Sequence, residues 1–336
     1  MPTILEKVSL QPYNSLALPA VAEFFCAVQT SAELLAALEF ARSRDLPVIP
    51  LGGGSNIVLA GDITGLVLRI DIKAVSHRVL GELVEVTFAA GENWHDFVLW
   101  AVKNNFGGIE NLSLIPGNVG AAPIQNIGAY GVELKDIFHS CRGVMLDSLN
   151  EFELTKSECE FDYRSSIFKS KFKNKIIITS VQFILTKSRH NFNINYNDLK
   201  INLVNTELTI KKISDEVIRI RKSKLPDPKS FGNCGSFFKN PIVNISRYKS
   251  LIDKFPKIPC HKINKSNYKI SAAWLIDQSG FKNKKDKKVG VYVNQPLVII
   301  NHGNASGRDL LNLANNIKET IYSNFEIELE EEVLII

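Results

Sequence analysis

The chain has 336 residues, of which 45% are hydrophobic and 22% are charged, and this balance is typical of a packed globular protein rather than a disordered one. A chain of this length is expected to form more than one domain. The formal net charge is +5, but the basic excess lies in the second half, where the lysine-rich run 282–288 is predicted to be a solvated turn. Nucleic-acid binding is therefore not expected, whereas a modest positive field suits a dianionic substrate or a phosphorylated cofactor.

The sequence carries no sign of a membrane span, an export signal, a disulfide framework or a metal site. Its apolar runs are far shorter than the roughly 20 residues that cross a bilayer, and residues 1–7 lack a basic start followed by an apolar block. The five cysteines are scattered, and the six histidines show no metal-ligand spacing. We therefore expect a cytoplasmic protein with reduced cysteines, no metal and no membrane partner.

The first predicted helix begins at Thr30, because Thr30 and Glu33 have the spacing of a capping box and apolar residues follow at helical intervals to about Arg44. Short strands are expected at 47–51 and 57–59, on either side of a glycine-rich turn. The patterns further predict strands at 66–70, 83–89, 143–146, 152–155 and 176–185, and a helix at 94–104. The first half is thus predicted to be α+β.

The second half follows a helix that starts near Ser214 and must end before Pro226, since proline cannot continue a helix. This point is a candidate domain boundary. The remaining elements are expected to be a helix at 271–278, a strand at 290–301, a helix from near Ser306 and a final strand at 327–333. The fold class predicted for the whole chain is α+β.

The glycine-rich turn consists of residues 52–56, Gly-Gly-Gly-Ser-Asn. Glycine has no Cβ, so its backbone amides can approach an anion such as a pyrophosphate closely. A tight turn between two strands explains the run equally well. The run is neither the Gly-x-Gly-x-x-Gly of a Rossmann unit nor a phosphate loop followed by Gly-Lys-Ser/Thr, so neither common nucleotide fold is supported.

A second segment, residues 115–131, reads Ile-Pro-Gly-Asn-Val-Gly-Ala-Ala-Pro-Ile-Gln-Asn-Ile-Gly-Ala-Tyr-Gly. Its glycines are interleaved with small residues and with the amides Asn118, Gln125 and Asn126. This composition suits a loop that wraps around a planar, polar, phosphorylated ligand, and a purely structural loop rarely needs it.

Together the two segments resemble the FAD-binding half of the UDP-N-acetylenolpyruvoylglucosamine reductase family, which makes a peptidoglycan precursor. The resemblance implies the FAD-binding fold shared with vanillyl-alcohol oxidase and p-cresol methylhydroxylase, built from two α+β subdomains and followed by an α+β substrate-binding domain. It places the first subdomain at 1–70, completed by the C-terminal strand 320–336, the second at 71–217 and the substrate domain at 218–319. It also implies a tightly bound, non-covalent FAD, held by Gly52, Gly53, Gly54, Ser55, Asn56, Ile115, Pro116, Gly117, Gly120, Gln125, Asn126, Gly128, Ala129 and Tyr130.

Three later runs, at 161–169, 224–240 and 329–333, extend the resemblance over almost the whole chain. They imply reduction of UDP-N-acetylglucosamine enolpyruvate to UDP-N-acetylmuramate, with a hydride passing from NADPH through flavin N5 to C3 of the substrate. By this resemblance Arg164 holds the enolate-like intermediate, Ser236 donates a proton to C2, and Glu332 is the catalytic glutamate. A serine hydroxyl is a weak acid, so its role requires a strongly basic carbanion as the acceptor. Taken singly, an arginine in a surface ion pair and a serine in a turn are the plainer readings.

Four further residues resemble substrate-binding positions of the family. Lys224 and Asn240 match contacts to the diphosphate, and Tyr163 matches a residue at the substrate and nicotinamide face. Tyr196 matches the mobile tyrosine of the subgroup with a lid loop, and a core tyrosine is its alternative reading. We expect a monomer whose partners are NADPH and the sugar nucleotide.

The chain departs from the family pattern in several places. Ala121 and Ala122 replace serines that some relatives carry near the flavin, and Cys234 stands where a smaller residue is common. Glu331 replaces a usual proline, and the chain stops at Ile336, soon after the catalytic glutamate. Two alternative functions remain open: an oxidase or dehydrogenase on the same flavin fold, and a catalytically idle protein that binds nucleotides or nucleic acid.

Overall fold

The computed structural model describes residues 2–282 and 287–336, so the central residues of the solvated turn predicted at 282–288 lie outside the described residues. Contacts divide the chain into two compact units. Unit 1 comprises Met1–Val8, Ala22–Gly54 and Ile63–Lys222, and unit 2 comprises Ser9–Val21, Ser55–Asp62 and Ser223–Ile336. Each unit therefore combines segments that are far apart in the sequence.

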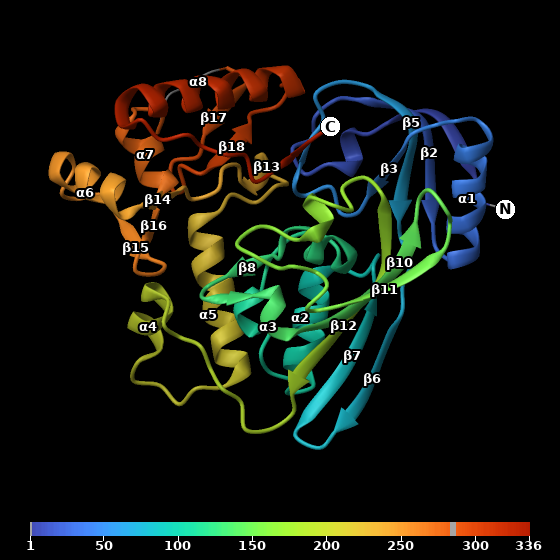
Figure 1. Cartoon of the computed structure of the whole chain (residues 1–336), viewed down its shortest axis with the longest axis horizontal. Coiled ribbons are helices and arrows are strands. Elements are labelled where there is room, and N and C mark those ends of the chain that lie inside the picture. Colours follow the sequence, from blue (N-terminus) through green and yellow to red (C-terminus); the bar gives the residue numbers. More distant parts are fainter. Residues whose placement is uncertain (1, 283–286) are drawn as a thin grey trace. The chain divides into compact units, whose positions relative to one another are not determined.

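Unit 1 contains a four-stranded sheet in the order β1-β2-β5-β3 (Figure 1). The strands are β1 (Ile4–Ser9), β2 (Val21–Val28), β3 (Val48–Leu51) and β5 (Ile63–Ile70), and β2, β5 and β3 run parallel. Helix α1 (Ser31–Ser43) packs its apolar face into the core of this sheet. Because β2, β5 and β3 are parallel, their carboxyl ends share one edge, the edge at which open α/β sheets bind ligands.

Helix α1 begins where the sequence predicts. Thr30 Oγ1 accepts the N–H of Glu33 at 3.2 Å, which is the first half of a capping box. The reciprocal bond is shifted by one residue, because the Glu33 carboxylate accepts the N–H of Gln29 at 2.7 Å. The cap thus also fixes the first residue after β2.

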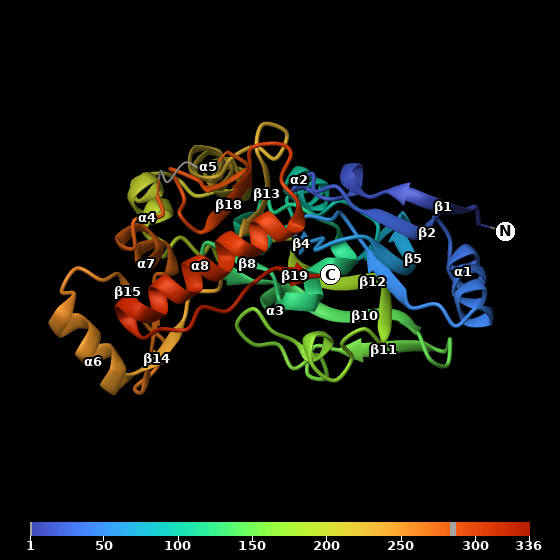
Figure 2. The same ribbon diagram turned by 90° about the horizontal axis from the view of Figure 1, so that it is seen from above.

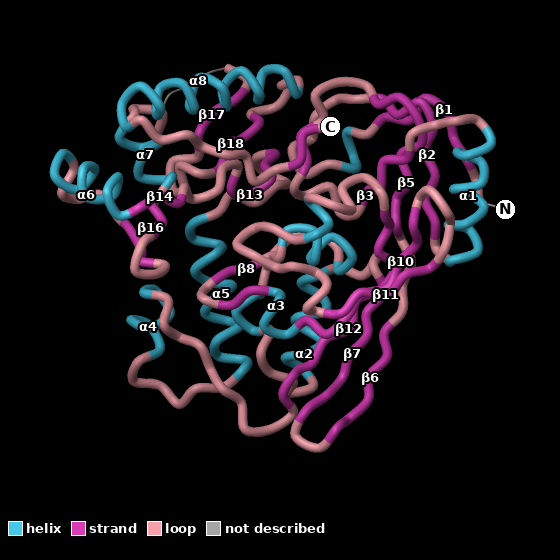
Figure 3. The backbone as a smooth tube through the Cα atoms, in the orientation of Figure 1, coloured by secondary structure: helices cyan, strands magenta, loops and turns pink. Residues whose placement is uncertain are grey.

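The second sheet of unit 1 has five strands in the order β11-β10-β12-β7-β6 and is antiparallel throughout (Figures 1 and 3). Its strands are β6 (Val75–Leu80), β7 (Leu83–Ala89), β10 (Phe138–Met145), β11 (Glu151–Thr155) and β12 (Ile176–Thr186). Helix α2 (Trp94–Lys103) covers one face. The ring of Phe97 lies 4.1 Å from that of Phe88 and 4.8 Å from that of Phe183, so aromatic contacts dominate this core.

The remaining elements of unit 1 are short, except for one helix. They are η2 (Glu110–Leu112), η3 (Val119–Gln125), β8 (Gly128–Ala129), β9 (Val132–Glu133), α3 (Leu134–Ile137), η4 (Ile167–Lys169), α4 (Asn197–Leu203) and α5 (Ile210–Lys224). Helix α5 ends before Pro226 as predicted, but it starts at Ile210 rather than near Ser214. Thr209 Oγ1 accepts the N–H of Lys212 at 3.1 Å and so supplies an earlier cap.

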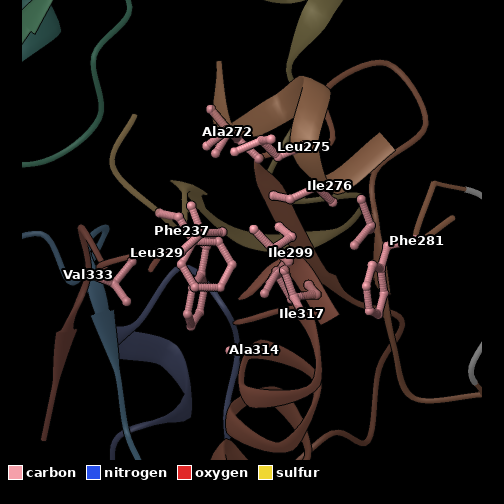
Figure 4. Close-up of a cluster of buried hydrophobic side chains, with 14 of the residues drawn as sticks. Phe237, Ala272, Leu275, Ile276, Phe281, Ile299, Ala314, Ile317, Leu329 and Val333 are labelled. Atoms are coloured by element: carbon pink, nitrogen blue, oxygen red, sulfur yellow. The ribbon is translucent and has the colours of Figure 1, made fainter. Parts of the chain in front are cut away.

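Within its described residues, unit 2 contains two three-stranded antiparallel sheets, the short pair β4 (Ile57–Val58) and β19 (Leu334–Ile335), and three α-helices. The sheets are β13-β18-β17, formed by Gly232–Ser236, Val298–Asn301 and Val289–Val291, and β14-β16-β15, formed by Ile242–Asn244, Asn267–Ile270 and Cys260–Lys262. The helices are α6 (Ile245–Lys254), α7 (Ala272–Gln278) and α8 (Gly307–Phe325), and η1 (Gln11–Tyr13) precedes β2 in the chain. Residues of α7, α8 and β18 share one core with Phe237, Leu329 and Val333 (Figure 4).

The single strand predicted at 290–301 is wrong, because this segment is a hairpin of β17 and β18. The N–H of Tyr292 donates to the carbonyl of Val298, and the N–H of Val298 donates to that of Gln295, both at 2.9 Å. The turn between them contains Pro296, which has no N–H to offer to a continuous strand.

The final strand predicted at 327–333 is also wrong in its extent. Residues 327–333 are irregular, and the strand proper is β19 (Leu334–Ile335), which pairs in parallel with β4 (Ile57–Val58) (Figure 2). The N–H of Ile336 donates to the carbonyl of Val58 at 2.9 Å. The end of the chain is therefore anchored in unit 2.

Candidate active site

The first predicted cofactor segment lies at the carboxyl end of β3, on the edge shared by the parallel strands. Gly54 has a φ of +61°, which glycine adopts without strain. A Cβ on Gly53 would lie 2.9 Å from Gly117 Cα and 2.9 Å from Asn118 Oδ1. Unit 1 therefore brings residues 52–54 against the second predicted segment, and only a bare backbone fits between them.

The second segment is held by a ladder of hydrogen bonds to the stretch that leads into α2. The N–H of Trp94 donates to the carbonyl of Gly117, and the N–H groups of Val119 and Gly120 donate to the carbonyls of Glu92 and Ala90, at 2.9–3.0 Å. A Cβ on Gly120 would lie 2.4 Å from that of Ala90. Glycine is thus required at this position by close packing of two backbones.

The side chain of Asn126 holds this segment to neighbouring residues by hydrogen bonds. Asn126 is fully buried, with a φ of +46°. Its Nδ2 donates to the carboxylate of Glu133 at 3.2 Å and to the carbonyl of Asp162 at 3.0 Å, while its Oδ1 accepts the N–H of Lys135 at 3.0 Å. The side chain predicted to bind the cofactor therefore connects this segment to the turn that carries Arg164.

Arg164 reaches the same segment with its guanidinium. Its Nη2 donates to the carbonyl of Gly128 at 2.7 Å, and its guanidinium carbon lies 5.4 Å from the ring centroid of Tyr163. Arg164 also has a positive φ of +51°, which is uncommon for a residue with a Cβ. The backbone of Arg164 is therefore locally strained, and its guanidinium is held at a fixed place beside the predicted flavin loop.

Two tyrosines and a second arginine complete this region of unit 1. The rings of Tyr130 and Tyr196 lie 5.0 Å apart at 70°, and burial raises the pKa of Tyr130 to about 12. Arg221, near the end of α5, interacts with both Tyr130 and Arg164. Burial lowers the pKa of Arg221, and the nearby Arg164 cation adds to this lowering while Tyr130 opposes it.

Arg221 was not predicted from the sequence. Among residues 2–282 and 287–336, no hydrogen-bond acceptor reaches its buried Nε. A buried cation beside a second arginine is costly unless an anion binds between or near them. Arg164 and Arg221 together are therefore suited to bind a carboxylate. The sequence shows Arg221 only as one of several basic residues at the end of a predicted helix.

A polar cavity lies beside the glycine segments in unit 1. Its volume is about 730 Å³, which falls within the range of small-molecule sites. Thr30, Arg69, Asp71 and Lys73 line it at the carboxyl ends of β2 and β5, and Asn118 connects it to Gly53. Arg69 pairs with Asp71 at 2.8 Å and Lys73 with Glu92 at 3.6 Å, so the lining offers both hydrogen-bond donors and acceptors to a nucleotide.

Unit 2 brings Ser236 and Glu332 together. Ser236 ends β13 and follows Gly235, whose φ is +72°. The N–H of Glu332 donates to the carbonyl of Phe237 at 2.8 Å, and Asn56 Nδ2 donates to the carbonyl of Glu332 at 3.2 Å. Asn56, predicted to bind the cofactor, therefore also holds the segment that carries the predicted catalytic glutamate.

The carboxylate of Glu332 is close enough to affect the neighbouring strand. Burial raises the pKa of Cys234 to about 12, and the negative charge of Glu332 contributes to that rise. Phe237 and Phe238, which follow the serine in the chain, are buried in the core of unit 2, where Figure 4 labels Phe237. The segments that carry Ser236 and Glu332 are thus joined next to a buried aromatic pair.

The other predicted substrate residues of unit 2 are associated with the ends of helices, one through a hydrogen bond and one by its place in the chain. Asn240 Oδ1 accepts the N–H of Ala272 at the start of α7 at 3.0 Å, and this bond orients its amide group. Lys224 is the last residue of α5. Glu331, where the resemblance implied a proline, pairs with Lys318 of α8 at 2.8 Å. Glu331 therefore has an ion-pair partner in this chain.

Metal and membrane features are absent from the described part of the chain. There, no group of three or more His, Cys, Asp or Glu side chains is arranged to hold a metal ion, and no helix is long and apolar enough to cross a bilayer. Cys26, Cys141, Cys159, Cys234 and Cys260 are all free thiols.

Two family matches define the class of protein. Residues 22–147 match the FAD binding domain, and residues 227–336 match the C-terminal domain of UDP-N-acetylenolpyruvoylglucosamine reductase. Both glycine-rich positions described above, Gly53 and Gly120, lie within the residues that match the FAD binding domain. The chain is an FAD-dependent oxidoreductase with the predicted α+β flavin-binding fold.

Whole-chain relatives define the particular family. UDP-N-acetylenolpyruvoylglucosamine reductase of Flavobacterium johnsoniae is 45% identical over 339 residues and covers 99% of each chain. The enzyme of the same name from Amoebophilus asiaticus is 42% identical over 337 residues and covers 98% of each chain. The crystal structure of the Thermus caldophilus reductase shares the fold, with a TM-score of 0.70, 23% identity and coverage of 100% of this chain and 99% of that one. The chain therefore belongs to the UDP-N-acetylenolpyruvoylglucosamine reductase family, and the predicted resemblance is confirmed.

Proposed function

We propose that this chain reduces UDP-N-acetylglucosamine enolpyruvate to UDP-N-acetylmuramate with NADPH as the electron donor, in the cytoplasmic synthesis of peptidoglycan precursors. The observation that carries the proposal is the pair of guanidinium groups, Arg164 and Arg221, beside the glycine segments of a flavin-binding fold. This pair is suited to hold a carboxylate while negative charge develops on the atom next to it.

We propose that FAD is held by Gly52, Gly53, Gly54, Ser55, Asn56 and the segment 115–131, with its adenylate end in the cavity lined by Arg69 and Lys73. Ala121 and Ala122 offer no side-chain hydrogen bonds, so the contacts rest largely on backbone amides. When bound, FAD supplies the transfer of a hydride from NADPH to C3 of the enolpyruvyl ether.

The two arginines have the first role in the proposed reaction. Hydride addition at C3 leaves negative charge at C2 and on the adjoining carboxylate. Charge-assisted hydrogen bonds from Arg164 and Arg221 would strengthen as that charge grows, so they stabilise the intermediate more than the substrate. Arg164 is positioned for this by its bond to Gly128, and Arg221 by burial against Tyr130.

Ser236 has the second role, as the donor of a proton to C2. Its hydroxyl can act only on a strongly basic carbanion. The backbone N–H of Glu332 donates to the carbonyl of Phe237, the residue after the serine. A protonated Glu332 carboxyl group would return a proton to Ser236 after the serine has given its own proton to C2. The buried Phe237 and Phe238 would limit protonation by water.

The remaining assignments concern substrate binding and organisation. Lys224 and Asn240 would bind the diphosphate, Tyr163 would line the substrate and nicotinamide face, and Tyr196 would cover the nucleotide. We keep the division into subdomains 1–70 with 320–336 and 71–217 and a substrate domain 218–319 as part of the proposal, together with a monomeric state.

A spectrum and a rate measurement test this function. The purified protein should show flavin absorbance that NADPH bleaches, and the sugar-nucleotide substrate should restore it. Rapid hydrogen peroxide formation with an alcohol would instead support an oxidase on the same fold. A colourless protein that binds oligonucleotides at low salt would support the idle alternative.

A further inference from the structure

The segment before the flavin loop is fixed to the first turn of α2 by side chains as well as by backbone. Trp94 Nε1 donates to the carbonyl of Leu112 at 3.0 Å, and the N–H of Leu114 donates to Nδ1 of His95 at 2.9 Å. The Leu112 carbonyl and the Leu114 N–H lie just before residues 115–117, and the backbone N–H of Trp94 donates to the carbonyl of Gly117. The start of the flavin loop therefore rests on two adjacent residues, Trp94 and His95.

Leu114 occupies an unusual backbone conformation. Its φ is +58°, in the left-handed region that residues with a Cβ rarely adopt. Such a conformation costs free energy and persists only where surrounding contacts impose it. The bond from its N–H to His95 is one contact that imposes it, and the next turn, through Pro116 and Gly117, depends on the direction that Leu114 sets.

His95 can make this bond only as a neutral imidazole, because a protonated ring has no free acceptor nitrogen. The backbone N–H of His95 donates to Oδ1 of Asn93, the N-cap residue of α2, at 2.9 Å. Three charged groups face it: Asp96 on its own helix, and Arg221 and Lys222 on α5. Partial burial lowers the pKa of His95, and the two cations add to this effect against the opposing carboxylate.

We propose that His95 is a positioning residue for the cofactor: its neutral ring holds Leu114 and thereby keeps the loop 115–117 in the conformation that binds FAD. The inference rests on the proposed placement of FAD at residues 115–131. Protonation of His95 removes the acceptor and adds a cation beside Arg221 and Lys222. FAD affinity should therefore fall once the pH drops below the pKa of this ring.

Two substitutions separate this role from simple packing. His95→Asn places an amide oxygen near the position of Nδ1, so it keeps an acceptor for the Leu114 N–H but cannot titrate. His95→Phe keeps a ring of similar size and removes the acceptor. FAD binding to the apo-protein is measured by quenching of flavin fluorescence between about pH 8 and about pH 5, where an ordinary histidine titrates.

The wild-type protein should bind FAD at constant affinity above pH 6.5, the ordinary pKa of histidine, and lose up to about tenfold per pH unit below the lowered pKa. His95→Asn should bind FAD near neutral pH about as tightly as wild type, and its FAD affinity should no longer fall at acid pH. His95→Phe should bind about ten- to a hundredfold more weakly at every pH, since the partly buried N–H of Leu114 loses its acceptor. Hydrogen exchange at the Leu114 amide should be faster in His95→Phe alone.

The inference is overturned if the FAD affinity of His95→Asn falls at acid pH as that of wild type does, or if a folded His95→Phe binds FAD at wild-type affinity. The Asn variant decides the matter even where the Phe variant does not fold. Because only FAD binding and amide exchange are measured, a protein that passes these tests but fails to reduce the sugar nucleotide would contradict the proposed function and not the role of His95.

Discussion

The N–H of Glu332 donates to the carbonyl oxygen of Phe237 at 2.8 Å, so the residue next to Ser236 is tied directly to the predicted catalytic glutamate. On either side of this bond, the N–H of Lys239 donates to the carbonyl of Glu330 at 2.9 Å, and Asn56 binds the carbonyl of Glu332. The serine and the carboxylate come from segments almost a hundred residues apart, and this short ladder sets their relative position.

Ser236→Ala should separate the two halves of the reaction. NADPH should still bleach the flavin, because the variant changes only the proton donor to the substrate. Substrate reduction should fall by about 10²- to 10⁴-fold, the usual worth of a positioned acid. Single-turnover absorbance measurements distinguish the halves, and Ser236→Cys should retain part of the activity. Near-normal turnover of the alanine variant would refute the assignment.

Gly120→Ala should weaken FAD binding. Its Cβ would lie 2.4 Å from that of Ala90, so the loop must move, at a cost of about 1–3 kcal/mol for overpacking. Gly61→Ala is the matched control, because a Cβ at Gly61 meets nothing within 4 Å. The flavin-to-protein ratio after gel filtration, together with the midpoint of urea unfolding, provides the measurement. Equal flavin content in both variants would show that the loop at Gly120 does not bear on the cofactor.

Arg221→Met should reduce kcat/KM for the sugar nucleotide by about 10- to 150-fold, the worth of a hydrogen bond to a charged group. The melting temperature should stay the same or rise, since the substitution removes a buried and incompletely paired charge. Arg219→Met, on the same helix, removes an exposed arginine that pairs with Glu216 and should leave catalysis unchanged. If both variants had the same kinetics, Arg221 would have no part in the site.

The N-terminus of α8 should add stability that is lost in acid. Hydrogen bonds from the N–H and hydroxyl of Ser306, and then the nearby Lys288, lower the pKa of Asp309 to about 2. Because the folded pKa lies below the ordinary 3.8, this contribution is present above that pH and disappears as the pH falls toward 2. Asp309→Asn should flatten this part of the curve of urea midpoint against pH. An unchanged curve would mean that other carboxylates account for acid unfolding.

Local sequence signals predicted much of the fold because their causes are local. Thr30 and Glu33 mark the start of α1, and Ser306 marks that of α8, since each cap needs only neighbouring residues. The hairpin at 290–301 was missed because its apolar pattern runs through the turn, so only Pro296 signalled the break. The strand at 327–333 was overextended because its hydrogen-bond partners, such as Phe237 and Asn56, are distant in sequence.

The site shows the same division between local and distant causes. Glycine-rich motifs marked residues 52–56 and 115–131, but only the fold shows that Gly53 meets Asn118. The motif around Arg164 identified one guanidinium. Arg221 was not found from the sequence, because its proposed role depends on its burial and on the nearby Tyr130 and Arg164, neither of which a single sequence displays.

The most direct test of the proposed function follows isotopes through one turnover. Deuterated NADPH is mixed with UDP-N-acetylglucosamine enolpyruvate and the FAD-loaded protein in ordinary water, and then unlabelled NADPH is used in heavy water. We predict UDP-N-acetylmuramate with one deuterium at C3 in the first case and solvent deuterium at C2 in the second. A protein that carries FAD, is reduced by NADPH and yet transfers no label to the sugar nucleotide would contradict the proposal.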